Sequence, residues 1–248
     1  MEFNNEGKKS YVYQLFQSIA PKYDLMNTLM SFGIDKYWRK VVAREAALQP
    51  GDRALDVGAG TGKLSLELAK QLDNSGEVVC MDFSENMLKK AKEDLQRSEY
   101  HDLFSFKCGD AMDIPFADNQ FNAATNALVL RNVEDISTVL KEMKRVVKPG
   151  GRVVSLDLAK PKSKVFSFFY YKYLNKFIPY LGRLIYGKRG PYDYLPASLK
   201  DFPAQDQLSK LHKDVGLVRV RYIELTGGIV AAHIGEKPCK IMRNLNVE

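Results

Sequence analysis

The feature that most constrains the fold is the stretch 54–64, which reads ALDVGAGTGKL. An apolar run that ends at Val57 leads into a turn with three glycines at alternate positions, and a leucine-rich helical pattern follows. This order predicts a buried strand, a tight turn and a helix. Glycines adopt positive φ and let a ligand approach the backbone, and the helix presents unpaired N–H groups there. We predict a ligand-binding turn, with a tight turn that binds nothing as the alternative.

The glycine spacing indicates which ligand this turn binds. A dinucleotide-binding turn has the pattern G-x-G-x-x-G, but Lys63 stands where its third glycine would be. A bulky lysine does not suit the close packing of helix on strand that this glycine allows. The pattern G-x-G-x-G resembles the turn of S-adenosylmethionine-dependent methyltransferases, and a nicotinamide enzyme is disfavoured.

Composition limits the class of protein and its partners. The chain has 248 residues, 45% of them hydrophobic, which fits one α/β domain with a full core. A net charge of +7 favours anionic partners, meaning nucleic acid, an anionic membrane surface or an acidic substrate. The first ten residues lack the apolar core of a signal peptide, and no apolar run is long enough to span a bilayer. We therefore expect a cytoplasmic protein, with peripheral contact with the inner face of a membrane left open.

The three cysteines, Cys80, Cys108 and Cys239, are not clustered. Cys80 and Cys108 lie in apolar strand patterns, so we expect buried, inert thiols. The spacing predicts neither a disulfide framework nor a metal site.

Hydrophobic periodicity predicts two helices before the first strand, and then strands that alternate with helices. Helices are expected at 11–19, 35–48, 62–72, 85–97, 136–147 and 205–215. Strands are expected at 53–57, 77–81, 103–108, 121–128, 152–158, 217–225 and 229–235. This alternation predicts a doubly wound, mainly parallel sheet, and the terminal hairpin adds an antiparallel strand. Residues 1–10 and the tail after Pro238 are expected to be loose.

Polar residues gather near the carboxyl ends of the predicted strands. Asp56, Asp82, Asp110 and Asn126 all lie near such ends. Ligands of open parallel sheets bind beyond these ends. The convergence predicts a binding site there.

The segment 162–196 departs from the alternation, because it is rich in aromatic and basic residues with almost no acid. We predict a helical insertion after the fifth strand. Such a composition is typical of a membrane-surface helix, a pocket lid or a helix that covers the sheet. The aromatic residues follow helical core spacing, so nucleic acid is not expected.

Longer blocks of sequence resemble one family, the ubiquinone/menaquinone biosynthesis C-methyltransferases, that is, the demethylmenaquinone methyltransferase family. The blocks that carry the resemblance are FQSIAPKYDLMNTLMSFGIDKYWR (16–39), LDVGAGTG (55–62), GDAMDIPFADNQF (109–121), LRNVED (130–135), KEMKRVVKPGGRV (141–153), YDYLPASLKDFP (192–203) and LTGGIVAAHIG (225–235). It implies a class I methyltransferase of one domain, with a helical lid (1–50), a cofactor-binding core (51–160), a basic aromatic insertion (161–204) and a closing helix and hairpin (205–236). It also implies S-adenosylmethionine as cofactor, S-adenosylhomocysteine as product and a prenylated quinol as acceptor, methylated on a ring carbon.

Several positions depart from this family. The family usually has His at Asp35, an acid at Lys63, Ser at Ala127, Phe-Gly at 128–129, and Glu and Ser at Asp157 and Ala159. Asp35 lies on the side expected for the acceptor, so another lipid, phenolic or small-molecule acceptor stays open. A non-catalytic membrane or nucleic-acid binding module is the alternative of a different class. A homodimer also stays open.

The resemblance and the strand ends together assign the cofactor site. Asp82 is expected to accept both ribose hydroxyls, and Asp110 with Ala111 to bind the adenine edge. The alternatives are an acid at a helix N-terminus for Asp82 and a turn-forming side chain for Asp110. Asp56 orients the turn or meets the ammonium group. The expected cofactor-binding residues are Asp56, Gly58, Gly60, Thr61, Gly62, Asp82, Phe83, Met87, Asp110, Ala111, Asn126 and Ala127.

Four residues are candidates for catalysis. A phenol titrates near 10, so a cation or base beside the acceptor hydroxyl would help to ionise it and make the ring carbon nucleophilic. Arg131 is expected to stabilise the phenolate, with a surface arginine paired to Glu134 as the alternative. Asn132 is expected to position the hydroxyl. Tyr23 is either part of the lid or core, and His233 is either a general base or a hydrogen-bonded strand residue. Met26, Leu29, Met30 and Phe32 are expected to meet the prenyl chain or to pack as core.

Overall fold

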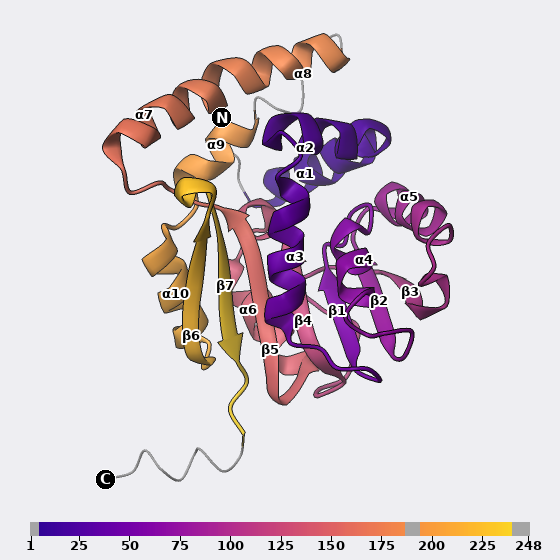
Figure 1. The fold of residues 1–248 in the computed structure, drawn as a ribbon. Coiled ribbons are helices and arrows are strands. Elements are labelled where there is room, and N and C mark those ends of the chain that lie inside the picture. Colours follow the sequence, from indigo (N-terminus) through magenta and orange to yellow (C-terminus); the bar gives the residue numbers. More distant parts are fainter. Residues whose placement is uncertain (1–4, 187–193, 240–248) are drawn as a thin grey trace, which may run out of the picture.

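One seven-stranded sheet forms the centre of the protein (Figure 1). The computed structural model describes residues 5–186 and 194–239. The strands lie in the order β3-β2-β1-β4-β5-β7-β6, and β7 alone among them runs antiparallel to its neighbours. The strands are β1 (Arg53–Val57), β2 (Glu77–Asp82), β3 (Phe104–Cys108), β4 (Phe121–Ala127), β5 (Val147–Leu158), β6 (Val218–Leu225) and β7 (Val230–Glu236). The predicted doubly wound sheet with an antiparallel C-terminal strand is confirmed.

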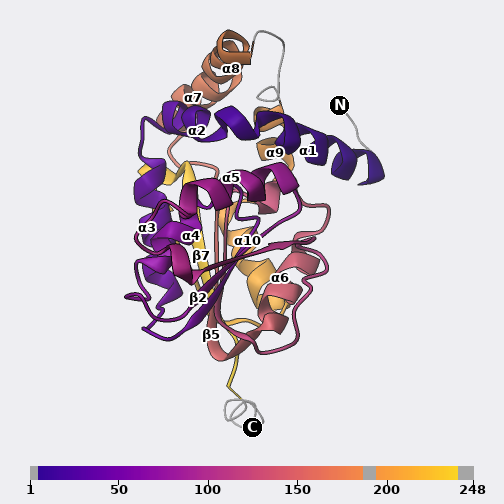
Figure 2. The same cartoon turned by 90° about the vertical axis from the view of Figure 1, so that its right-hand side faces the viewer.

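The sheet is covered on both faces, because its central strands bury side chains on both sides. Leu55 and Val57 of β1 pack with α6 and α10, whereas Ala54 packs with α3 and α4. Figure 2 shows the resulting layers, with the sheet between two sets of helices. One face is covered by α3 (Asp35–Ala46), α4 (Lys63–Ala69) and α5 (Glu85–Leu95), and the other by α6 (Ile136–Val146) and α10 (Gln205–Asp214).

A third group of helices lies beyond the carboxyl ends of the strands, at the top of Figures 1 and 2. It consists of α1 (Asn5–Ile19), α2 (Tyr23–Ser31), α7 (Lys164–Lys172), α8 (Ile178–Tyr186) and α9 (Tyr194–Asp201). A π-helical turn over Tyr173–Phe177 joins α7 to α8. Pro179 follows this turn and cannot donate a backbone hydrogen bond, which accounts for the widened turn. The predicted helical insertion is confirmed.

In the part of the chain that the structure describes, no helix has the length and apolarity needed to cross a membrane.

The prediction of two helices before the first strand is wrong, because α2 is a third. Pro21 lies in the first turn of a short 3-10 helix, Ala20–Lys22, where a missing N–H is tolerated, and the chain turns helical again at once. Phe32 and Gly33 then end α2 with φ of 52° and 77°. Residues 5–10 are helical rather than loose, whereas residues 1–4 and the tail from 240 lie outside the described part.

Two further predictions fail at strand edges. β5 begins at Val147 and not at residue 152, because Val147 pairs with Phe121 before the register shifts. Cys80 is buried as predicted, but Cys108 is exposed because β3 is the edge strand of the sheet.

Replacement of Gly62 by alanine is expected to destabilise the fold more than the same change at Gly33. Both residues have φ near +78° (79° and 77°), so alanine is strained by about 1–2 kcal/mol at either position. A Cβ at Gly62 would also lie 2.7 Å from Cδ1 of Leu95, whereas nothing lies within 4 Å at Gly33. Overpacking adds about 1–3 kcal/mol. Urea unfolding measures both variants, and equal losses would contradict the packing argument.

Candidate active site

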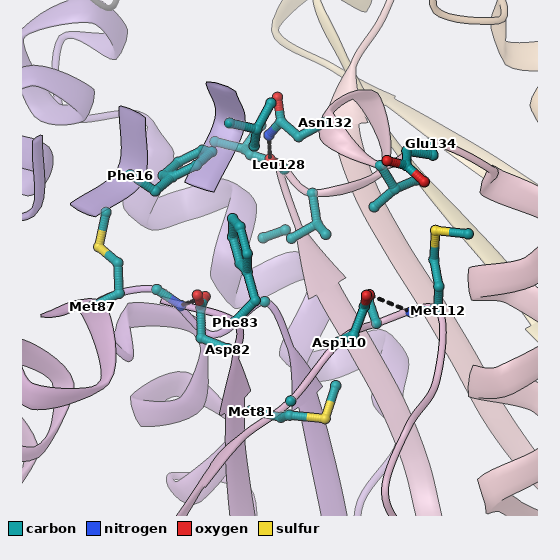
Figure 3. Close-up of a pocket in the computed structure, with 18 of the residues that line it drawn as sticks. Phe16, Met81, Asp82, Phe83, Met87, Asp110, Met112, Leu128, Asn132 and Glu134 are labelled. Carbon is teal, nitrogen blue, oxygen red and sulfur yellow. Dashed lines mark hydrogen bonds between the residues drawn. The ribbon is translucent and has the colours of Figure 1, made fainter. Parts of the chain in front are cut away.

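A cleft opens at the carboxyl ends of β1, β2 and β4, the place where the strand order reverses and ligands of such sheets bind. It encloses about 800 Å³ of space between atoms, part of it open to solvent. Its lining comes from α1, the first residue of α2, one residue of α5, and the ends of strands with the loops that follow them, and it is mostly apolar (Figure 3). The predicted strand ends therefore do meet at one cleft.

The glycine turn after β1 forms one wall of the cleft. Gly58 and Gly60 line it, with φ of 69° and 56°. A Cβ on Gly58 would lie 2.5 Å from Cγ2 of Val129, so only glycine fits beneath that side chain. At Gly60 the nearest atom is Cε1 of Tyr23, 3.9 Å from such a Cβ, which is an ordinary van der Waals contact, so space does not require glycine there.

Asp82 joins the end of β2 to this turn. Its Oδ2 accepts a hydrogen bond from the Gly60 N–H at 2.8 Å, and its Oδ1 accepts one from the Ser84 N–H at 2.8 Å. The side chain is buried, and this burial raises the pKa of Asp82 to about 6 although the hydrogen bonds favour the charged form. A carboxylate has about four acceptor sites, so the ionised group keeps capacity for ligand hydroxyls.

Asp110 and Ala111 follow β3 on the opposite side of the cleft (Figure 3). Oδ1 of Asp110 accepts a hydrogen bond from the Met112 N–H at 2.9 Å. The turn-forming role offered as the alternative is therefore present, and the residue lines the cleft as well.

Aromatic side chains from distant parts of the sequence close the cleft. Phe16 of α1 packs edge-on against Phe83 and Tyr23, with ring centroids 6.2 Å and 6.0 Å apart. Met87 of α5 is buried beside them. Phe83, Met87 and Tyr23 are predicted site residues, whereas Phe16 is not. Phe16 lies in the helical pattern of α1, whose apolar face gave no sign of contact with this cleft.

The loops after β3 and β4 supply further lining residues that the sequence reasoning missed. They are Met112, Leu128, Val129, Val133 and Glu134. Their position directly after strand ends was the signal that could have identified them. Leu128 has φ of 64°, a conformation uncommon for a bulky residue, and its N–H donates to the Leu156 carbonyl at 2.7 Å.

Four predicted cofactor residues lie behind the lining rather than among the described residues that form it. Asp56 is buried, and it accepts a hydrogen bond from the Ser65 hydroxyl at 2.7 Å. Burial raises the pKa of Asp56 to about 7. Asn126 is buried with its amide 3.1 Å from the Ser155 hydroxyl. Gly62 lies under Leu95 of α5. Ala127, by contrast, does line the cleft as predicted.

Thr61 is the fourth predicted cofactor residue outside the lining, and it links α2 to the glycine turn. Its hydroxyl donates to Oδ1 of Asp24 at 2.6 Å. Lys63 lies 3.4 Å from Oδ2 of the same carboxylate and 3.5 Å from Asp94 of α5. Through these contacts α2 is held against both sides of the cofactor turn.

Among the catalytic candidates, Asn132 and Tyr23 line the cleft. The side-chain amide of Asn132 donates to the Leu128 carbonyl at 3.0 Å. Arg131 lies behind the lining, where its Nη1 donates to Oδ1 of Asp157 at 2.6 Å. The two side chains are only 8% and 1% exposed, so the surface position offered as the alternative for Arg131 is wrong.

His233 lies on β7, outside the described lining of the cleft. Its Nε2 donates to the Gln205 carbonyl at 2.9 Å, and its ring stacks on His212 at 5.5 Å. Burial lowers the pKa of His233, and that of His212 to about 4. The hydrogen-bonded strand histidine, offered as the alternative, describes this arrangement.

Asp35 is likewise distant from the lining. It is buried at the start of α3, where it accepts a hydrogen bond from the Ser31 hydroxyl at 2.9 Å and pairs with Arg39. The negative charge of Asp35 is therefore balanced by Arg39 within the N-terminal helices.

Comparisons with known proteins identify the family. Residues 4–237 match the ubiE/COQ5 methyltransferase family. The chain is 47% identical to a demethylmenaquinone methyltransferase of Desulfitobacterium hafniense over 96% of this chain and 94% of that protein. It is 40% identical to one of Staphylococcus aureus, over 94% of this chain and 96% of that protein. A solved SAM-dependent methyltransferase from Aquifex aeolicus shares the fold, with a TM-score of 0.58 and 21% identity over 79% of this chain and 88% of that one. The chain belongs to the ubiE/COQ5 methyltransferase family.

Proposed function

We propose that this protein transfers a methyl group from S-adenosylmethionine to a ring carbon of a reduced demethylmenaquinone, a step of menaquinone biosynthesis. The names of two relatives that match nearly the whole chain support this acceptor. The observation that carries the proposal is the Asp82–Gly60 hydrogen bond at the rim of an apolar cleft. It places an acceptor of hydroxyl groups beside a glycine backbone that lines the cleft.

The residues of the cleft fit this cofactor. Asp82 would accept the ribose hydroxyls, and the backbone at Gly58 and Gly60 would lie against the amino-acid end. Asp110 and Ala111 would meet the adenine edge, and Phe83 its apolar surface. Asp56 would act indirectly, by fixing the turn from beneath. S-adenosylmethionine supplies, when bound, an electrophilic methyl group on a positively charged sulfur.

The remaining lining residues prepare the acceptor. The aromatic wall of Phe16, Tyr23 and Phe83 would shield the bound reactants from water on one side, which would strengthen electrostatic interactions there. Asn132 would hold the hydroxyl beside the reacting carbon, since its own amide is fixed by the Leu128 carbonyl. Arg131 would act as a positioning residue, because its pair with Asp157 anchors the loop that carries Asn132. We propose a structural role for His233.

Methyl transfer is tested directly with purified protein, S-adenosylmethionine labelled in the methyl group, and a short-chain demethylmenaquinol. We expect label in the quinol, released together with S-adenosylhomocysteine. Calorimetry with the cofactor runs in parallel. Binding heat without label in the quinol would reject this acceptor, and absence of heat would reject the cofactor site itself. A homodimer stays a prediction, which light scattering tests.

Replacement of Asp82 by asparagine is expected to weaken cofactor binding about tenfold to a hundredfold, since hydrogen bonds to a charged group contribute about 1.5–3 kcal/mol. The wild-type affinity is also expected to depend on pH. The pKa of Asp82 in the free protein is about 6, and bound hydroxyl donors and a nearby positive charge favour the ionised form. Binding therefore weakens as pH falls through 6, by about tenfold between pH 7 and pH 5.

Asp113→Asn is the matched control, because Asp113 is exposed in the neighbouring loop. It should keep both the affinity and the pH dependence of the wild type. Calorimetric titration at pH 5, 6 and 7 compares the three proteins. Retention of the full pH dependence by the Asp82→Asn protein would show that another group titrates.

Replacement of Arg131 by lysine, or of Asp157 by asparagine, is expected to lower kcat by about tenfold to a hundredfold while the dissociation constant of the cofactor changes less than about threefold. Misplacement of a positioned group by 1 Å costs up to about a hundredfold in rate. Arg44→Lys, at an exposed position of α3, serves as the control. Thermal unfolding identifies the fraction folded. An equal loss of cofactor affinity and kcat would argue against a role on the acceptor side.

A further inference from the structure

The helices α7 and α8 are apolar on two opposite sides. One side packs into the protein, where Tyr170, Leu174 and Ile178 form a buried cluster with Met26 of α2 and Leu199 of α9. The spacing of four residues places these three side chains on one side of the helical segment. The inner side therefore provides the buried contacts that hold the segment against the rest of the protein.

The outer side carries large apolar side chains that no described residue buries. Phe168, Phe169 and Tyr180 are 58%, 63% and 64% exposed, and Val165 and Leu184 are each 71% exposed. A helix that is apolar all round is normally buried. Contiguous exposed apolar surface marks a site of interaction. We therefore expect the exposed apolar side chains of the outer side to be covered by a partner outside this chain.

The corner between α2 and α3 continues this surface, although it lies about 140 residues earlier in the sequence. The Tyr173 hydroxyl donates to the Met30 carbonyl at 2.8 Å, and the Phe32 ring lies 6.2 Å from the Tyr173 ring. Tyr173 in turn stacks on Phe177 at 5.1 Å. Phe32 is 76% exposed. We call the combined surface the aromatic face, which consists of Phe32, Val165, Phe168, Phe169, Phe177, Tyr180 and Leu184.

Along α7 and α8, every charged side chain beside the aromatic face is positive. Lys164, Lys172, Lys176 and Arg183 are exposed there, and no Asp or Glu occurs between residues 158 and 192. The Lys172 ammonium lies 4.9 Å from the centre of the Phe168 ring. Aromatic rings that enter the acyl boundary, with lysines and arginines at the phosphates, are typical of helices that lie on a membrane surface.

We propose that the aromatic face docks on the surface of an anionic phospholipid bilayer. The absence of acidic residues favours a lipid surface over a protein partner, because a protein interface that excludes one sign of charge over two helices needs a highly acidic partner. The face lies over the same end of the sheet as the cleft, and α2, which contributes Phe32 at its end, contributes Tyr23 to the cleft at its start (Figure 2). If the acceptor is a prenylated quinol, which rests on the proposed function, docking places the cleft beside the bilayer that dissolves it.

Sedimentation with vesicles tests the docking on the full-length protein. Vesicles of phosphatidylcholine with about 30% phosphatidylglycerol are compared with phosphatidylcholine alone. We expect the wild type to pellet with the anionic vesicles and to be released by raised salt. Lys172→Glu with Lys176→Glu should reduce the partition coefficient about tenfold or more, since each basic residue near an anionic surface contributes roughly fivefold. Phe169→Ser with Tyr180→Ser should reduce it at constant charge.

Lys210→Glu with Lys213→Glu is the matched control, because both lysines are exposed on α10 and the change in net charge is the same. This variant should partition like the wild type. Equal losses in the two charge variants would show attraction by net charge only and overturn the docking face. A wild type that does not pellet with anionic vesicles would overturn the docking. Serine variants that bind vesicles like the wild type but change the oligomeric state in light scattering would assign the face to a second copy of the chain.

Activity assays separate this proposal from the proposed function. The serine variant should methylate a short-chain quinol in solution at the wild-type rate, and lose activity only toward a long-chain quinol in vesicles. Vesicle binding without methyl transfer by the wild type would reject the acceptor and leave the docking intact. Transfer to both quinols at unchanged rates by the variant would reject docking as the route to the acceptor.

Discussion

The contact between the Asp82 carboxylate and the Gly60 N–H is the interaction on which the site depends. It fixes the turn after β1 to the end of β2, two strands whose register already places Val57 beside Met81. A buried carboxylate is costly unless its oxygens are hydrogen-bonded, so this group requires the turn to keep its shape. This shape requires glycine at the points of positive φ, and the last glycine, Gly62, leaves room for Leu95 of α5. Cofactor site, turn and helix packing are therefore one structural unit.

Most of the fold could be predicted from the sequence, because its information is local. Apolar runs that end in polar residues mark parallel strands, and a serine directly before a helical pattern is a local start signal, as at Ser84, whose hydroxyl accepts a hydrogen bond from the Met87 N–H. The failures arise where tertiary pairing overrides a local signal. No helix was predicted between residues 19 and 35, but Pro21 lies in a short 3-10 helix that leads directly into α2. The strand predicted from residue 152 begins at Val147, because pairing with Phe121 extends it through Gly150 and Gly151.

The site was predictable to the level of strand ends but not of side-chain direction. Asp56 and Asp82 both occur near the ends of buried strands, yet Asp56 precedes the last residue of β1 and stays beneath the turn, whereas Asp82 is the last residue of β2 and reaches the cleft. The register pairs Asp56 with Cys80, which lies two positions before Asp82 on the same face of the sheet, so Asp82 lies further toward the carboxyl ends of the strands and Asp56 lies beneath it. Phe16 and Arg131 needed tertiary information of another kind. Phe16 reaches the cleft from a helix that is distant in the sequence, and Arg131 pairs with the buried Asp157 instead of lining the cleft.

Three departures from the family pattern, Val129, Lys63 and Asp35, are compensated where they occur, which bears on whether the chemistry is retained. Val129 stands where the family usually has glycine, and its side chain fills the space that the missing Cβ of Gly58 leaves. Lys63 stands where an acid is common, and it lies between Asp24 of α2 and Asp94 of α5, so the substituted charge finds carboxylates on both sides. Asp35 has Arg39 and Ser31 as partners. None of these changes removes a group that Asp82, Gly60 or Asn132 needs. They alter instead the contacts that hold α2 and the loop after β4 at the cleft.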